Sequence, residues 1–168
     1  MVTIMDNSIS QAHITYRTAN ERDVPDILRV IQAAFAEYNG KLDPPSSAHH
    51  KTIAIVQAEL AKATAILAEV GTELVGCVFY QSKEDYVYLD RLAVLPVWRG
   101  QGIAGELIHL VEQQAIQQGK NKVQLSVRIS LKAHHAYYQK KGYTFKHYGR
   151  HPGYDQPTYL VLEKLLNL

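Results

Sequence analysis

The chain has little cysteine, no long apolar run and no repeated or low-complexity segment. The single cysteine, Cys77, excludes an internal disulfide and a zinc site built from several cysteines, which favours a reducing compartment. No apolar run reaches the roughly 18 residues that a membrane span requires. Residues 1–11 lack the charged-then-apolar order of a signal peptide. We therefore expect a cytoplasmic protein with no membrane segment and no metal site.

Acidic residues are scarce in the last third of the chain. Residues 113–168 hold 9 Lys and Arg against 2 Asp and Glu, a net charge of +7, whereas residues 1–112 hold 9 against 14, a net charge of −5. This asymmetry has three interpretations: a solvated surface, a site for a small polyanion, or a face that binds nucleic acid. The basic residues are scattered and form no dense arm, so nucleic acid is the least favoured of the three.

Hydrophobic periodicity predicts a single domain over residues 12–168, preceded by a flexible lead-in at residues 1–11. The expected strands are 14–17, 65–70, 74–80, 86–94, 123–127, 143–148 and 158–163. A first helix is expected to begin near residue 20 or 23, and others to span 49–62, 102–118 and 131–141. Helices between strands imply right-handed crossovers, and hairpins imply antiparallel neighbours. The order predicts an α/β fold whose mixed sheet has helices on both faces.

The most informative stretch is residues 94–105, Val-Leu-Pro-Val-Trp-Arg-Gly-Gln-Gly-Ile-Ala-Gly. A strand ends there, a turn built on glycine follows, and an amphipathic helix begins. Such a junction points unpaired backbone N–H groups and the positive end of a helix dipole at one place. The sequence therefore predicts a phosphate-binding site.

Residues 100–105 spell G-x-G-x-x-G, the fingerprint of dinucleotide binding, but the context differs. Residues 96–99 separate the strand from the first glycine. The acidic residue expected about 20 positions later would fall within 113–154, which contains none. Gly-Lys occurs only at 40–41 and 119–120, in neither place followed by Ser or Thr, which argues against a Walker A loop. NAD and ATP are therefore not favoured as ligands.

The same stretch has a second match. Val94-x-Pro96-x-x-Arg99-Gly100-x-Gly102-Ile103-Ala104-x-x-Leu107 resembles the acyl-CoA motif of the GNAT N-acetyltransferase superfamily. The order of elements is also similar, from about residue 13 to residue 165. The resemblance implies a GNAT-like mixed, mostly antiparallel central sheet of about seven strands with helices on both faces. It also implies acetyl-CoA as cosubstrate.

By this resemblance, main-chain groups of one strand end would contact pantetheine, and N–H groups of the turn would hold the pyrophosphate. The first set is Leu92, Ala93 and Val94, and the second is Arg99, Gly100, Gln101, Gly102, Ile103, Ala104 and Gly105. Small residues let the backbone approach the phosphates, and each N–H that meets an oxyanion makes a charge-assisted bond. The alternative is a glycine-rich turn that holds no ligand.

Residues 136–143, Ala-Tyr-Tyr-Gln-Lys-Lys-Gly-Tyr, resemble the family's helix that ends in L-Y-E-K-x-G-F. Tyr138 stands where many members have a tyrosine that lies near the CoA sulfur and protonates the departing thiolate. A phenol suits that task because it is a neutral donor at pH 7; a core tyrosine is the alternative. The chain departs from the pattern at Leu131, where the family often has Asn, and at Tyr143, which replaces Phe. We expect Tyr137 in the core.

The other candidates carry weaker signals. Asp90 is expected on the same strand face as Leu92, as the base that takes the ammonium proton; a salt bridge to Arg91 is the alternative. Lys140 is a candidate contact for the CoA 3′-phosphate. The histidine pairs at 49–50 and 134–135 diverge by about 100° on a helix and do not predict a metal site. Cys77 is expected to be a buried small hydrophobe.

The sequence thus predicts an N-acetyltransferase that moves the acetyl group of acetyl-CoA to a primary amine of a small molecule by direct transfer. The alternative is a non-catalytic acyl-CoA-binding or sensor module, which Leu131 favours and the retention of Arg99 and Tyr138 disfavours. A nucleic-acid-binding protein is the third hypothesis. We expect neither a nucleic-acid nor a membrane partner, and dimers in the family make a homodimer a further expectation.

Overall fold

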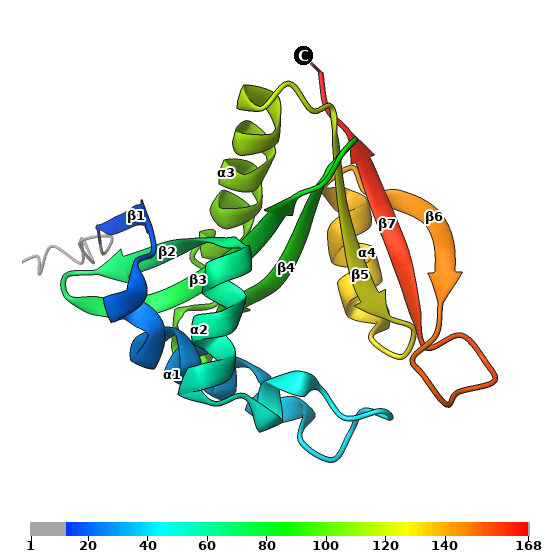
Figure 1. Cartoon of the computed structure of the whole chain (residues 1–168), viewed down its shortest axis with the longest axis horizontal. Coiled ribbons are helices and arrows are strands. Elements are labelled where there is room, and N and C mark those ends of the chain that lie inside the picture. Colours follow the sequence, from blue (N-terminus) through cyan, green and yellow to red (C-terminus); the bar gives the residue numbers. More distant parts are fainter. Residues whose placement is uncertain (1–12, 168) are drawn as a thin grey trace, which may run out of the picture.

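The computed structural model describes residues 13–167, which are built around one seven-stranded sheet (Figure 1). The strand order is β1-β2-β3-β4-β5-β7-β6, and every neighbouring pair is antiparallel except β4 and β5. The strands are β1 Ile14–Thr18, β2 Thr64–Val70, β3 Glu73–Ser82, β4 Val87–Val94, β5 Lys122–Arg128, β6 Thr144–Gly149 and β7 Tyr159–Leu165. The lead-in predicted at residues 1–11 lies outside the described residues.

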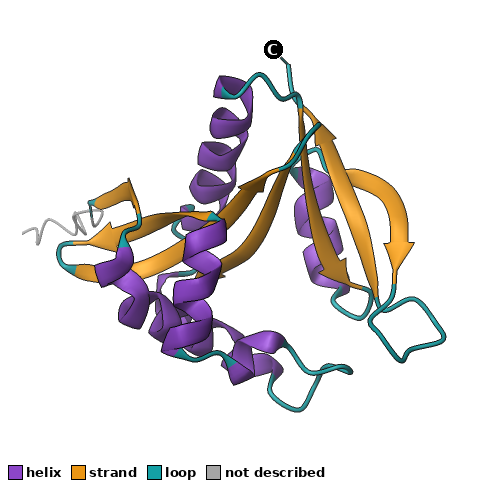
Figure 2. Cartoon of the chain, viewed as in Figure 1, coloured by secondary structure: helices purple, strands orange, loops and turns teal. Residues whose placement is uncertain are grey.

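The α-helices are α1 Val24–Phe35, α2 Ile53–Lys62, α3 Ile103–Gln117 and α4 Lys132–Lys140 (Figure 2). In Figure 1, α1 and α2 lie in front of the sheet and α3 lies behind it. The predicted fold class, a mixed and mostly antiparallel sheet with helices on both faces, is confirmed. Within residues 13–167, no helix combines the length and the apolar character needed to span a membrane.

The core lies against the central strands. The apolar face of α3, the helix predicted to be amphipathic, is buried, with Leu107, Val111 and Ala115 all fully inaccessible to solvent. Cys77 on β3 is buried, as predicted, and burial raises the pKa of its thiol to about 12. The thiol therefore stays protonated at neutral pH and packs as an apolar group.

The predicted helix 49–62 is wrong at its beginning. Ser47–His50 form a 3₁₀ turn, and α2 begins only at Ile53. The hydroxyl of Thr52 accepts a hydrogen bond from the N–H of Ile55 at 3.2 Å, which makes Thr52 the N-cap. Lys51 is extended, and its buried amino group pairs with the carboxylate of Glu59 on α2. The cap and this ion pair separate two helical segments that composition alone had joined.

The sheet opens between β4 and β5. The two strands pair at only two positions, Val87 with Val123 and Tyr88 with Gln124, and then diverge (Figure 1). A β-bulge between Asp90 and Ala93 adds one residue to β4 relative to β3, and Arg91 there has a φ of 52°. The bulge interrupts the alternation of side chains along β4 just where the opening begins.

A buried ion pair ties α3 to β7. The carboxylate of Glu112 is within 3.0 and 3.1 Å of the amino group of Lys164, and the hydroxyl of Tyr143 donates to it at 3.1 Å. Replacing Lys164 by Met leaves Glu112 buried without its cation. We expect the free energy of unfolding to fall by about 2 kcal/mol, less than for a fully buried pair because Lys164 is partly exposed. Urea denaturation measures this change.

Lys146→Met is the matched control, because it removes the cation from an exposed pair with Glu163 at 3.1 Å. This loss is expected to cost less than about 1 kcal/mol. Equal losses in the two variants would contradict a special contribution from the buried pair.

Candidate active site

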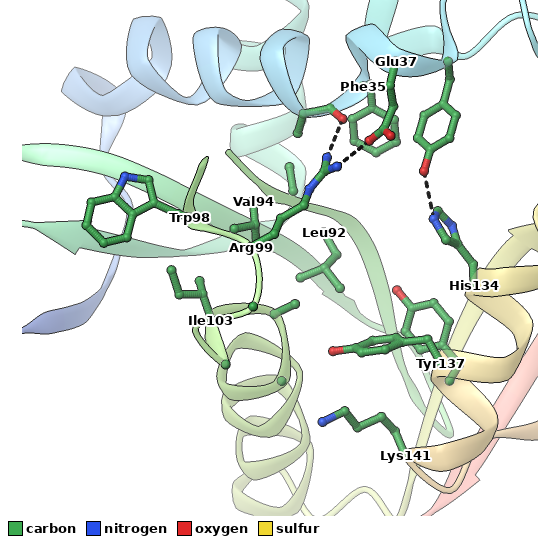
Figure 3. A pocket seen from close by; sticks show the side chains of 18 residues that line it. Phe35, Glu37, Leu92, Val94, Trp98, Arg99, Ile103, His134, Tyr137 and Lys141 are labelled. Carbon is green, nitrogen blue, oxygen red and sulfur yellow. Dashed lines mark hydrogen bonds and ion pairs between the residues drawn. The ribbon is translucent and has the colours of Figure 1, made fainter. Parts of the chain in front are cut away.

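The sequence-predicted cofactor residues gather in one cavity. It has a volume of about 640 Å³ and lies between the end of α1, the end of β4, the start of α3 and one face of α4 (Figure 3). The predicted residues that line it are Leu92, Ala93, Val94, Arg99, Gly100, Gly102, Ile103, Ala104, Gly105 and Tyr138. Gln101 is exposed outside the lining, and Asp90 lies in a neighbouring cavity.

The start of α3 presents free backbone donors to this cavity. Gly102 is the N-cap, and a glycine has no side chain to cap the helix. The hydrogen bond from the N–H of Glu106 to the carbonyl of Gly102, 3.1 Å long, begins the helical ladder, so the N–H groups of residues 103–105 have no partner within the helix. Gly100 and Gly102 both have a φ of 80°, and a Cβ added to either would meet nothing within 4 Å. This uncapped start can therefore receive an anion.

Arg99 turns its side chain toward α1. Its guanidinium lies 2.6 Å from the carboxylate of Glu37 and donates to the carbonyl of Ala34 at 3.0 Å (Figure 3). Its backbone N–H donates to the carbonyl of Pro96 at 3.3 Å. Arg99 thus ties the glycine turn to α1, and the free donors are the backbone N–H groups after it.

One face of α4 forms the opposite wall. His134, Tyr137, Tyr138 and Lys141 all line the cavity, at the i, i+3, i+4 and i+7 spacing of a single helical face. The amino group of Lys141 lies 2.9 Å from the position of a Cβ on Gly105, so this cation lies against the first turn of α3.

Sequence reasoning missed most of this wall. Lys141 lines the cavity and Lys140 does not, and Tyr137 lines it as well as packing against the core. The signal was the spacing itself: residues at i, i+3, i+4 and i+7 lie on one face of a helix, so these polar and aromatic residues indicate a shared surface.

Tyr138 stands with its ring packed and its hydroxyl free of protein partners within residues 13–167. Its ring meets those of Tyr137 and Tyr143 edge-on, with centroids 5.4 and 5.8 Å apart. Burial raises the pKa of the phenol above its ordinary value of 10.0. The phenol is therefore neutral and able to donate a proton throughout the physiological range.

A second cavity of about 580 Å³ lies in the opening between β4 and β5. Five side chains line both cavities: Phe35, Tyr38, Leu92, His134 and Tyr138. The second cavity continues along β4 past Asp90 and along β5 to Arg128, under the loop that contains Pro44 and Pro45. The two cavities therefore meet beside Tyr138.

Asp90 lines this second cavity with a half-exposed side chain. One carboxylate oxygen accepts from the N–H of Arg91 at 2.8 Å, and the other lies 3.9 Å from its guanidinium. The predicted alternative, a salt bridge to Arg91, is thus present as a long ion pair, and Asp90 still lines the cavity. The bulge separates Asp90 from Leu92, yet both line the second cavity.

A partly buried polar pair lies at the junction of the two cavities. The hydroxyl of Tyr38 and the Nε2 of His134 lie 2.9 Å apart (Figure 3). Burial lowers the pKa of His134, so its imidazole is neutral at pH 7. The sequence did not predict this contact, because Tyr38 follows α1 and His134 lies 96 positions later in the chain.

Comparison with known proteins identifies the class. The family model described as the Acetyltransferase (GNAT) family matches residues 27–143. An aminoalkylphosphonate N-acetyltransferase of Salmonella typhimurium is 35% identical over 60 residues, which cover 36% of this chain and 39% of that protein. This match therefore spans about two fifths of the relative's length.

Solved structures share the fold. The PaiA N-acetyltransferase of Thermoplasma acidophilum in complex with coenzyme A superposes with a TM-score of 0.76 at 17% identity, over 91% of this chain and 99% of that one. The ribosomal-protein-S18-alanine N-acetyltransferase of Escherichia coli gives 0.72 at 18% identity, over 93% and 96%.

The described residues combine a mixed split sheet with an uncapped helix start beside the split. The chain belongs to the GNAT acetyltransferase family, as residues 94–107 predicted.

Proposed function

We propose that the protein transfers the acetyl group of acetyl-CoA to a primary amine of a small molecule, by direct attack of the amine on the thioester. The observation that carries the proposal is the meeting of two cavities beside Tyr138, one ending at the free N–H groups of α3 and the other containing Asp90. A donor and an acceptor could thus approach one another from opposite sides.

The first cavity suits the donor. The N–H groups of residues 100–105 and the amino group of Lys141 would hold the pyrophosphate, and main-chain groups of Leu92, Ala93 and Val94 would contact the pantetheine arm. Glycine at 100 and 102 keeps the approach to these N–H groups open. The role proposed for Arg99 is to hold the turn through Glu37 and Ala34.

The proposed reaction uses two side chains and the backbone N–H groups. Asp90 accepts a proton from the ammonium, directly or through water, and the free amine attacks the thioester carbon. Backbone N–H groups polarise the thioester carbonyl. A C–N bond forms, the C–S bond breaks, and Tyr138 gives its proton to the departing thiolate. The nitrogen then loses its second proton, which passes directly or through water to the Tyr138 phenolate and restores the phenol. The products are an acetylated amine and free CoA thiol.

The acceptor proposed is a small molecule. The second cavity, about 580 Å³ in volume, is of the size that encloses small ligands. A partial relative is named for aminoalkylphosphonates, which are small primary amines. The proposed reaction requires one catalytic domain and neither nucleic acid nor a membrane; a homodimer and a cytoplasmic location stay expectations.

A thiol-release screen tests the proposal. The protein is mixed with acetyl-CoA and panels of small amines, amino acids, peptide N-termini and lysine peptides, and free CoA thiol is measured against time. We expect amine-dependent release with small amines and formation of the N-acetyl product. Saturable binding of acetyl-CoA without release across every panel would favour the alternative, a non-catalytic acyl-CoA-binding or sensor module.

A further inference from the structure

Arg128 lies in the wall of the second cavity and forms no ion pair with a described residue. It is the last residue of β5, and its side chain is partly buried. The guanidinium donates to the carbonyl of Pro44 at 2.7 Å and to that of Pro45 at 3.3 Å. Within residues 13–167, no Asp or Glu carboxylate lies within 4.0 Å of it. The two hydrogen bonds that fix its position go to neutral carbonyls.

This arrangement leaves donors free for a ligand. A guanidinium has five N–H donors, and the two proline carbonyls use two of them. The nearby carboxylate of Asp43 accepts a hydrogen bond from the hydroxyl of Tyr154 instead. Burial lowers the pKa of Arg128, but an arginine stays charged at neutral pH. A partly desolvated cation of this kind gains most from an anion that can accept two parallel bonds.

The other arginine of this cavity is a useful contrast. Arg91 lies 3.9 Å from a carboxylate oxygen of Glu59 and 3.9 Å from one of Asp90, so its charge is balanced within the protein. Arg128 has no such partner within the described chain. The position of Arg128 also matters, because it lies four residues beyond Gln124, the last residue of β5 that pairs with β4. Leu92 on β4 lines the same cavity, so the walls of the opening include Leu92 on one strand and Arg128 on the other.

We propose that the acceptor carries an anionic group, a carboxylate or a phosphonate, in addition to its amine, and that Arg128 binds this anion. The proposal rests on the function proposed above and names its substrate class. With the anion on Arg128 at the β5 wall, the amine of the acceptor reaches toward Asp90 on the β4 wall and the junction beside Tyr138. Arg128 is thereby a specificity-determining residue.

The test compares matched amines in the thiol-release assay. One pair is β-alanine and β-alaninamide, and the other is 2-aminoethylphosphonate and its diethyl ester. We expect kcat/KM to be at least about 10-fold higher for the anionic member of one pair, which also tells carboxylate from phosphonate. Arg128→Gln should lower kcat/KM for that anionic amine about 10- to 100-fold and leave its neutral partner nearly unchanged.

Arg22→Gln is the control, because Arg22 is exposed and lines neither cavity. This variant removes the same charge and should leave kcat/KM unchanged for both the anionic and the neutral amine. Since Arg128 also contacts Pro44 and Pro45, melting temperatures accompany the kinetics. If Arg128→Gln does not fold, Arg128→Lys replaces it. A lysine cannot donate two parallel hydrogen bonds as the guanidinium does, so kcat/KM should fall for the anionic amine and not for its neutral partner.

The outcomes separate the two proposals. Thiol release with neutral amines alone, or an equal loss for both members of a pair in the arginine variant, overturns the anionic acceptor and leaves the acetyltransferase standing. Absence of release with every amine overturns both.

Discussion

Replacing Tyr138 by Phe should lower kcat about 100-fold or more, while KM for acetyl-CoA changes little. The variant keeps the ring that packs between Tyr137 and Tyr143 and loses only the hydroxyl beside the junction of the two cavities. Without that hydroxyl, the thiolate must leave unprotonated or take a proton from water. Steady-state thiol release with saturating acetyl-CoA and amine measures the change.

Tyr137→Phe is the matched control, since Tyr137 is on the same face of α4 and lines the same cavity. It should keep most of the wild-type kcat. An unchanged kcat in Tyr138→Phe, or equal losses in both variants, would remove Tyr138 from the role of acid.

The pKa shift of Tyr138 predicts how kcat depends on pH. Burial raises the pKa of Tyr138 above 10.0, so the phenol stays protonated as pH rises toward that value. The acid is in its active form throughout that range, and its deprotonation should not lower kcat below about pH 10. A fall in the wild-type kcat with an apparent pKa near 8, absent from the Phe variant, would contradict the raised pKa.

Replacing Gly102 by Ala should raise KM for acetyl-CoA about 10- to 100-fold. Gly102 is the N-cap of α3 with a φ of 80°, a conformation that costs about 1–2 kcal/mol for a residue with a Cβ. Relief of this strain turns the N–H groups of the following residues away from the cavity. Each charge-assisted bond lost to the pyrophosphate contributes about 1.5–3 kcal/mol, or roughly one to two factors of ten.

Gly119→Ala is the control for strain alone. Gly119 follows the other end of α3, has a φ of 74°, and like Gly102 has open space where a Cβ would be. The two variants should lose similar stability in thermal melts, and only Gly102→Ala should lose affinity for acetyl-CoA. Equal KM values in both variants would show that the start of α3 does not hold the cosubstrate.

The fold was largely predictable because its signals are local. Alternation and apolar runs indicated each strand, and the stripe from Ile103 to Ala115 indicated α3. The predicted start of α2 was wrong for a physical reason. The apolar pattern of the sequence shows neither the N-cap hydrogen bond of Thr52 nor the ion pair of the buried Lys51 with Glu59. The bulge at Arg91 is similarly invisible in sequence, since the register against β3 produces it.

The site was predictable where one segment builds it. The turn at residues 99–105 carries its geometry in its glycines, and the motif named the family. The pairs of Arg99 with Glu37 and of Tyr38 with His134 join distant segments, so no local pattern reveals them. Lys141 was missed in favour of Lys140 because the choice depends on which face of α4 meets α3.

The short pairing between β4 and β5 has a consequence for the protein when acetyl-CoA is bound. Two residue pairs join one half-sheet, β1 to β4, to the other, β5 to β7 and β6. A pantetheine arm bound along β4, as proposed above, would bring amide groups that could form hydrogen bonds to the backbone of both diverging strands. Any ligand that binds only the folded chain also stabilises it by mass action. The bound cosubstrate would thus link the two halves of the sheet by hydrogen bonds, and its release at the end of each turnover would remove that link.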